Sequence, residues 1–298
     1  MRDNHPLAIR LSERGMKILR FPITRLILAL VFLIAFAGLA LGLASGIRNY
    51  LLSPESELLS SAIQMILMCS FTWAGYALYC ATVEGRPVFE LDPRKGIRQT
   101  GYGLLLGFAF ISLVMLTMWI TGSYRITGVR PVSVLWPVLI MSVQAGIVEE
   151  ILSRGIIFRI AEEGIGTWWS ILLSALIFGF LHIWNPNATI FSSVSIALTA
   201  GVILAMLYVI TRQLWIPIGL HIGWNFTLGG IYGAPVSGGE PDGIMAVAFS
   251  GPDWLTGGAF GPEASVITLV VFIVFGAFLV RKSIKEKSWI NPLWRTQK

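Results

Sequence analysis

Cysteine, histidine and charged residues are all scarce in this sequence. Of its 298 residues, two are cysteine, three are histidine and 13% are charged. Cys69 and Cys80 lie eleven residues apart in one apolar segment, which on a helix separates them by about 16 Å and excludes a disulfide bond between them. The sequence contains no CxxC, HExxH or GxSxG. These absences argue against a structural zinc centre, the helical zinc-hydrolase motif and a serine nucleophile on a sharp turn.

The low charge content indicates a membrane protein. Soluble proteins average about 25% charged residues, whereas this chain has 13%, with 55% apolar residues and a mean hydropathy of +0.74. Its formal net charge is +6, but the basic residues cluster at both ends and between apolar segments. That distribution is better explained by orientation in a bilayer than by a nucleic-acid partner, which we do not expect.

Apolar stretches long enough to cross a bilayer recur along the chain. A hydrocarbon core of about 30 Å requires about 20 helical residues. We predict an all-α, polytopic membrane protein with about eight transmembrane helices that enclose an intramembrane polar site. The predicted spans are 26–44, 58–83, 101–121, 132–160, 167–184, 188–210, 214–229 and 264–280. The remaining segments are a basic N-terminal tail, 1–25, a loop at 230–263 and a basic C-terminal tail, 281–298.

The basic residues predict the orientation of these spans. With eight spans, both tails and most basic loop residues fall on one side, namely Arg86, Arg94, Lys95, Arg98, Arg154, Arg159 and Arg212. Only Arg48, Arg125 and Arg130 fall opposite, and the loop 230–263 has no Lys or Arg. The positive-inside rule therefore predicts cytoplasmic N- and C-termini and a non-cytoplasmic loop at 230–263.

Residues 146–155, Gly-Ile-Val-Glu-Glu-Ile-Leu-Ser-Arg-Gly, place two carboxylates and a guanidinium among apolar residues. Each charge costs roughly 2.5 to 3.5 kcal/mol at the centre of a membrane helix. Glu150 and Arg154 are four residues apart, the spacing of a helical ion pair, whereas Glu149 points about 100° away around the helix. We expect Glu150 and Arg154 to form a structural pair and Glu149 to face a cavity.

Two of the three histidines also lie in apolar segments. His182 ends the apolar run 172–182 in the fifth predicted span, and His221 lies in the seventh with Asn225 one turn further on. The turn sequence Gly164-Ile165-Gly166 falls midway between positions 149 and 182, which predicts an antiparallel helical hairpin with Glu149 and His182 at one level.

Each of these polar residues alone has a structural explanation, such as a hydrogen bond between membrane helices. Together, a carboxylate, two imidazoles and a carboxamide on three neighbouring spans favour an acid–base site. Two alternatives stay open. A glutamate and two histidines are an acceptable zinc ligand set, and a non-enzymatic membrane regulator or transporter would use the same cluster as a proton or ligand relay.

At these residues the chain resembles the CPBP family of intramembrane proteases, which includes the type II CAAX prenyl endopeptidases and bacteriocin-related members. The motifs EExxxR, FxxxH and HxxxN are carried by Glu149, Glu150, Arg154, Phe178, His182, His221 and Asn225. The resemblance covers about 94–229, the expected catalytic core.

This resemblance implies an eight-helix membrane enzyme without a metal cofactor. It implies that Glu149 and His182 activate a water molecule, that His221 and Asn225 stabilise the oxyanion, and that Glu150, Arg154 and Phe178 support them. Zinc is a less favoured possibility. The implied partner, besides the lipid bilayer, is a peptide or lipidated protein in or at the membrane, and whether it is prenylated stays open.

Overall fold

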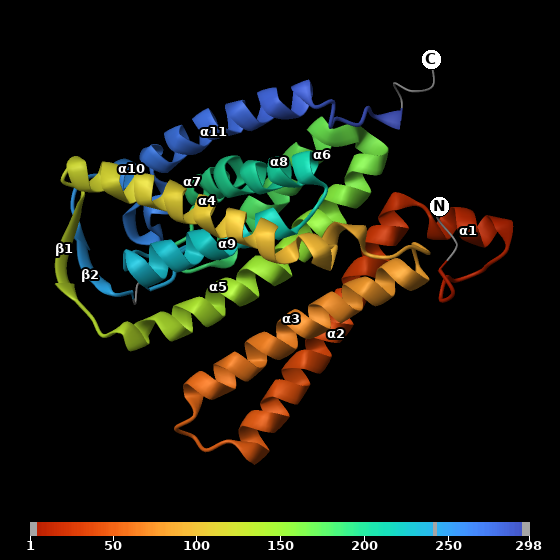
Figure 1. The fold of residues 1–298 in the computed structure, drawn as a ribbon, viewed down its shortest axis with the longest axis horizontal. Helices are drawn as coiled ribbons and strands as arrows, with labels where there is room; N and C mark the ends of the chain where they lie inside the picture. Colours follow the sequence, from red (N-terminus) through yellow and green to blue (C-terminus); the bar gives the residue numbers. More distant parts are fainter. Residues whose placement is uncertain (1–4, 241–242, 294–298) are drawn as a thin grey trace.

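The computed structural model describes residues 5–240 and 243–293, most of which are helical (Figure 1). The two predicted tails lie partly outside the described residues. The α-helices are α1 (Glu13–Leu19), α2 (Pro22–Leu51), α3 (Glu57–Thr82), α4 (Pro93–Ile120), α5 (Leu135–Glu150), α6 (Arg159–Leu181), α7 (Ile190–Ile196), α8 (Val202–Thr211), α9 (Trp215–Asn225), α10 (Asp253–Thr256) and α11 (Val266–Lys285). Segments of π-helix at Ile151–Phe158, Ala197–Gly201 and Phe226–Ile231 extend α5, lead into α8 and extend α9.

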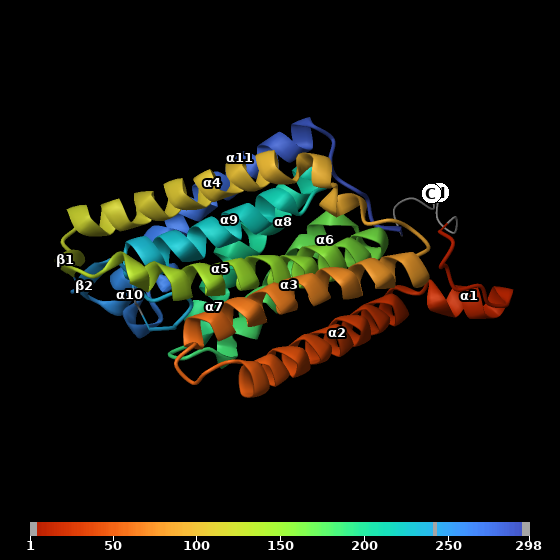
Figure 2. The same ribbon diagram turned by 60° about the horizontal axis from the view of Figure 1, so that its bottom comes forward.

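The polytopic helical architecture agrees with the predicted one. In the described part of the chain, six stretches are long and apolar enough to cross a membrane. Helices α2, α3, α4 and α11 fall on four predicted spans, and Figure 2 shows α2 and α3 running side by side. A fifth stretch, Ile190–Thr211, joins α7 to α8. The number eight stays a prediction, because the other predicted spans do not appear as separate long helices.

The sixth stretch, Val132–Trp184, has 53 residues and contains two predicted spans. Its helix is interrupted at Gly166, where φ is +76° and ψ is 170°. Only glycine adopts this conformation without strain, and a Cβ there would lie 2.7 Å from the nitrogen of Pro292. The chain reverses direction between its two halves, because His182 returns beside Glu149 with 4.0 Å between their nearest side-chain atoms. The predicted hairpin is therefore present.

Helix α9 lies close to α4 because both present glycine at their contact. A Cβ on Gly103 would lie 2.4 Å from the Ile216 carbonyl oxygen, and one on Gly219 would lie 2.3 Å from the Thr100 carbonyl oxygen. Small residues allow membrane helices to approach this closely. With 11 residues and a six-residue π-helical extension, α9 is shorter than a usual span, and it occupies the centre of the bundle.

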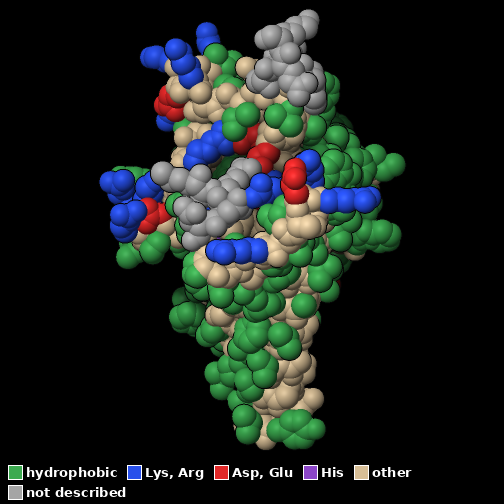
Figure 3. Space-filling view, turned by 90° about the vertical axis from the view of Figure 1, so that its right-hand side faces the viewer, with side chains coloured by type: hydrophobic (Ala, Val, Ile, Leu, Met, Phe, Trp, Pro, Cys, Tyr) green, Lys and Arg blue, Asp and Glu red, His purple; other side chains and the backbone are tan. Residues whose placement is uncertain are grey.

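A small antiparallel sheet adds to the all-α fold. Strand β1 (Tyr124–Val129) pairs with β2 (Met245–Phe249), so that Tyr124 lies opposite Phe249, with an irregularity between Ile126 and Gly128. The strands join the loop after α4 to the predicted loop 230–263. They lie at one end of the molecule, and α1 and the end of α11 lie at the other (Figure 1). Figure 3 views that second end, where most of the visible Lys and Arg side chains gather.

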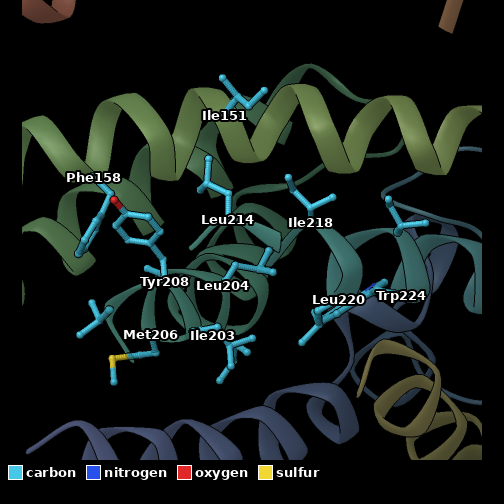
Figure 4. Close-up of a cluster of buried hydrophobic side chains, with 14 of the residues drawn as sticks. Ile151, Phe158, Ile203, Leu204, Met206, Tyr208, Leu214, Ile218, Leu220 and Trp224 are labelled. Atoms are coloured by element: carbon cyan, nitrogen blue, oxygen red, sulfur yellow. The ribbon is translucent and has the colours of Figure 1, made fainter. Parts of the chain in front are cut away.

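The apolar core surrounds α8 and α9. Figure 4 shows Phe158, from the segment after α5, beside Tyr208 of α8, with 5.6 Å between their ring centroids. The labelled residues are Ile151, Phe158, Ile203, Leu204, Met206, Tyr208, Leu214, Ile218, Leu220 and Trp224. Burial of this core fixes the positions of α5 and α9, which carry most of the polar residues predicted to form a site.

Candidate active site

The two membrane histidines converge on one carboxylate oxygen. Glu149 Oε2 lies 4.0 Å from His182 Nε2 and 4.0 Å from His221 Nε2. The Glu149 side chain is 37% exposed, whereas those of His182 and His221 are 13% and 9% exposed. The structure thus brings together three predicted site residues from α5, the end of α6 and α9.

Each histidine is oriented by a hydrogen-bond acceptor at its Nδ1 atom. His182 Nδ1 lies 2.8 Å from the Phe178 carbonyl oxygen, and His221 Nδ1 lies 3.0 Å from Glu150 Oε1. Because a carbonyl and a carboxylate only accept, both Nδ1 atoms carry the proton, and both Nε2 atoms face Glu149. The two rings nevertheless differ in their partners, since Glu150 offers a charged carboxylate and Phe178 a neutral backbone carbonyl.

Glu150 and Arg154 pair as their spacing predicts. Arg154 Nη1 donates to Glu150 Oε1 at 2.8 Å, and both side chains are fully buried. Arg154 Nη2 also donates to the Gly201 carbonyl oxygen at 2.9 Å, which ties the segment after α5 to the start of α8. Sequence reasoning gave Glu150 only the arginine as a partner. In the structure the same oxygen also accepts from His221.

Phe178 packs between the arginine and the histidines. The Arg154 guanidinium carbon lies 4.5 Å from the centre of its ring, a cation–π contact. The same ring lies 4.8 Å from the ring of His182 and 6.0 Å from that of His221, measured between centroids. Phe178 therefore limits the positions that the two imidazole rings can take.

Two cavities meet at Phe178 and His182. The larger, about 230 Å³, is lined by Glu149, Leu152, Ser153, Phe178, Leu181, His182 and Asn185. The smaller, about 20 Å³, is lined by Phe178, His182, Ile196, Ala200, Leu204, His221, Trp224, Asn225, Ser237 and Glu263. Glu149 thus faces a cavity, as the helical phase predicts, while Asn225 lies with His221 at the smaller one.

Ser237 and Glu263 were missed by sequence reasoning, which found no chemical motif in the loop 230–263. Glu263 Oε1 accepts from Trp224 Nε1 at 2.8 Å, and its Oε2 accepts from the Ser237 backbone N–H. The loop folds back over the helix ends that carry the site. The only local signal was a carboxylate directly before the last apolar span, and it does not reveal a partner 39 residues away.

Comparison with known proteins supports the resemblance that the sequence motifs indicate. Residues 131–227 match a family described as type II CAAX prenyl endopeptidase Rce1-like. This segment is therefore similar to that family. It contains every residue of the three motifs, so the resemblance to the type II CAAX prenyl endopeptidases is confirmed over this part of the chain.

A curated relative aligns with a similar share of the chain. The Bacillus subtilis (strain 168) protein named "Putative membrane peptidase YdiL" is 30% identical to it over 88 residues. The alignment covers 30% of this chain and 34% of the relative, so the chain matches about a third of that protein's length. No solved structure matches the chain.

Proposed function

We propose that the protein is an intramembrane endopeptidase that hydrolyses a peptide bond of a membrane-associated or lipidated substrate through a water molecule activated by Glu149 and His182. The convergence of two histidine Nε2 atoms on Glu149 Oε2, each at 4.0 Å, carries this proposal. These separations are too long for direct hydrogen bonds but suit a bridging water at hydrogen-bond distance from the carboxylate and an imidazole.

The different partners of the histidines support different roles. His182, whose Nδ1–H is directed at the Phe178 carbonyl oxygen, accepts a hydrogen bond from the water through its Nε2 lone pair. Glu149 removes a water proton while the water oxygen attacks the peptide carbonyl carbon. His221, oriented by its hydrogen bond to Glu150, donates Nε2–H to the oxyanion together with the Asn225 amide. Glu149 then returns its proton to the leaving nitrogen as the C–N bond breaks.

Zinc catalysis is the main alternative, and the geometry favours it less. With bonds of about 2.0 to 2.1 Å, ligand atoms of a tetrahedral zinc site lie roughly 3.3 Å apart, whereas the Glu149 and histidine atoms are 4.0 Å apart. Throughout residues 5–240 and 243–293, no group of three His, Cys, Asp or Glu side chains has spacing suited to a metal ion. Metal-free hydrolysis therefore remains our proposal.

The larger cavity supports an apolar or lipidated substrate. Leu152, Phe178 and Leu181 form much of the wall beside Glu149, and an apolar wall accepts a lipid or an apolar peptide segment. The family description names prenyl endopeptidases, so a peptide with an S-farnesylated cysteine fourth from its C-terminus is the first substrate to test.

The decisive experiment compares wild-type protein with the Glu149→Ala variant in nanodiscs, using that farnesylated peptide and mass spectrometry of the products. Glu240→Gln, which changes an exposed carboxylate, is the matched control. We expect cleavage by the wild type and the control and none by Glu149→Ala. Equal cleavage by all three proteins would exclude Glu149 as the base. In native membranes, peptides that accumulate in the Glu149→Ala strain would identify the natural substrate.

We further propose that both termini face the cytoplasm and that the loop 230–263 faces the opposite side. Exposed residues at the two ends of the molecule allow a direct test: Glu286 follows α11, and Ser250 follows β2. In a background without Cys69 and Cys80, a membrane-impermeant maleimide added outside intact cells should label Ser250→Cys and not Glu286→Cys. The reverse pattern would contradict the orientation.

A further inference from the structure

The segment 232–239 covers the smaller cavity and is held by hydrogen bonds from several elements. Asn185 Nδ2 donates to the Ser237 carbonyl oxygen at 3.0 Å, and Asn187 Nδ2 donates to that of Gly238 at 3.2 Å. The Gly238 N–H donates to the Phe260 carbonyl oxygen at 2.9 Å. Ser237 thereby lines the cavity that contains His182, His221 and Asn225.

Glu263 links this segment to the helix that carries two site residues. Its side chain is buried, and its two oxygens accept from different elements, Oε1 from Trp224 Nε1 on α9 and Oε2 from the Ser237 N–H. Ser195 Oγ on α7 donates to the Glu263 carbonyl oxygen at 2.7 Å. Backbone and side chain of Glu263 therefore join three parts of the fold at the edge of the site.

Trp224 connects Glu263 to the proposed oxyanion donors. It directly precedes Asn225 and follows His221 by three residues on α9. Its ring is buried and packs on Phe272 of α11, with 4.6 Å between ring centroids. Because α9 passes into a π-helical segment directly after Asn225, the hydrogen bond from Glu263 fixes this end of the helix where its backbone is least regular.

We propose that Glu263 is a positioning residue of the site, whose carboxylate fixes Trp224 and Ser237 and thereby sets His221 and Asn225 relative to Glu149. The proposal rests on the proposed peptidase function. Glutamine at this position keeps the shape of the side chain but has only one accepting oxygen. In Glu263→Gln one of the two N–H donors therefore loses its acceptor and faces an NH₂ group.

The kinetic test uses Glu263→Gln, with Glu240→Gln as the control because it removes an exposed carboxylate from the same loop. With the farnesylated peptide in nanodiscs, Glu263→Gln should lower kcat on the order of 10- to 100-fold, as expected for a small misplacement of catalytic groups. KM should change little, because the larger cavity is lined by other residues. Unchanged kcat, or an effect confined to KM, overturns the proposal.

Trp224→Phe provides a second variant that keeps the ring packing and removes only the indole donor. It should lower kcat as Glu263→Gln does, and the double variant should be no slower than the slower single variant, because both act through one hydrogen bond. If the double variant instead loses kcat by the product of the two single losses, Glu263 does not act through Trp224. If Glu263→Gln does not fold, Trp224→Phe decides alone, and wild-type kcat in that variant contradicts the proposal.

A labelling test separates this inference from the proposed function, because it needs no substrate. In a background without Cys69 and Cys80, a water-soluble maleimide should react faster with Ser237→Cys when Glu263→Gln is also present than with Glu240→Gln. Equal rates overturn the link between Glu263 and the loop. A wild-type protein that cleaves nothing contradicts the peptidase function, and this comparison then still decides whether Glu263 holds the loop.

Discussion

Two clusters of charged side chains in the interior of the protein differ in how completely their carboxylates are paired. One is the candidate site around Glu149. The other, here called the ionic network, joins α2, the chain between α3 and α4, and the hairpin of α6. It consists of Arg25, Glu84, Arg86, Glu90, Arg159 and Glu163, with the hydroxyls of Tyr76 and Tyr79.

Every carboxylate of the ionic network contacts an arginine at hydrogen-bond distance. Glu84 accepts from Arg86 Nε at 2.7 Å and from an Arg159 guanidinium nitrogen at 2.9 Å, and Glu90 accepts from two Arg86 nitrogens at 2.9 Å. Glu149 instead lies 4.0 Å from its two histidines and borders a cavity. A saturated carboxylate is a poor base, so incomplete pairing distinguishes a reactive group from a structural one.

The largest effect should come from replacing one carboxylate of the candidate site and, for comparison, one carboxylate of the ionic network by glutamine. Glu149→Gln should lower cleavage of the farnesylated peptide by about 100- to 10,000-fold, because it removes the general base, with little effect on stability. Glu90→Gln should destabilise the protein, because it removes the negative charge and one of the two oxygens that accept from Arg86. The measurements are kcat per folded protein and thermal unfolding in detergent. A similar loss of kcat per folded protein in both variants would remove the distinction.

Asn225→Ala should produce the next largest effect, and it tests whether the candidate site works by oxyanion stabilisation. Loss of one oxyanion donor should lower kcat about 100- to 1000-fold with little change in KM. Metal chelators should leave wild-type activity unchanged in the same assay. Stoichiometric zinc in active protein, with activity lost on its removal and regained on its return, would instead support histidine ligation of a metal.

The sequence predicted the candidate site better than it predicted the ionic network. The site residues stand out because a polar side chain within a long apolar segment is energetically costly. They are Glu149, His182, His221 and Asn225. Helical spacing also places residues four positions apart, such as His221 and Asn225, on one face of a helix. Glu84 and Glu90 lie in a short polar loop, where charged residues ordinarily face water. Their arginine partners come from several helices, so no local pattern indicates their burial.

The parts of the fold that sequence reasoning missed depend on contacts between distant segments. Strand β1 is separated from β2 by most of the bundle, and a strand of five or six residues in a loop has no long apolar pattern. The link from Glu263 to Trp224 likewise becomes visible only when the loop is placed on α9. Four predicted spans appear as single long helices, α2, α3, α4 and α11, because a bilayer requires about 20 apolar residues for each span.

An effect on stability, rather than mainly on cleavage, should separate the two adjacent glutamates of the site. Glu150→Gln leaves Arg154 buried without a charged partner and should cost about 3 to 5 kcal/mol of stability. It also weakens the hydrogen bond that orients the His221 ring, so kcat should fall as well. Glu149→Gln, with a partly exposed side chain, should unfold near the wild-type temperature. Equal destabilisation in both variants, measured in the same detergent, would contradict their separate roles.

The smallest effect is the acid sensitivity of the ionic network, which can be followed at Glu84. Burial by itself raises the pKa of Glu84, but Arg159, Arg86 and Arg25 outweigh it and hold this pKa well below its usual value. A carboxyl with a lower pKa in the folded state stabilises the protein at pH values above its unfolded pKa of about 4.3. This stabilisation is lost as the pH falls through the folded value. The contribution of Glu84 should thus stay constant between pH 7 and pH 5 and decrease below about pH 4.

Glu84→Gln tests this by removing the titrating group while keeping its size. The variant should already unfold at a lower temperature at pH 7, and its unfolding temperature should then decrease less than that of the wild type between pH 5 and pH 3. The difference in acid response should be modest, because Glu90, whose pKa is also lowered, still titrates in the variant. Parallel pH profiles for the two proteins would show that Glu84 gains no stability from its arginines. The ion pairs of the network would then not stabilise the protein, and the contrast with Glu149 would fail.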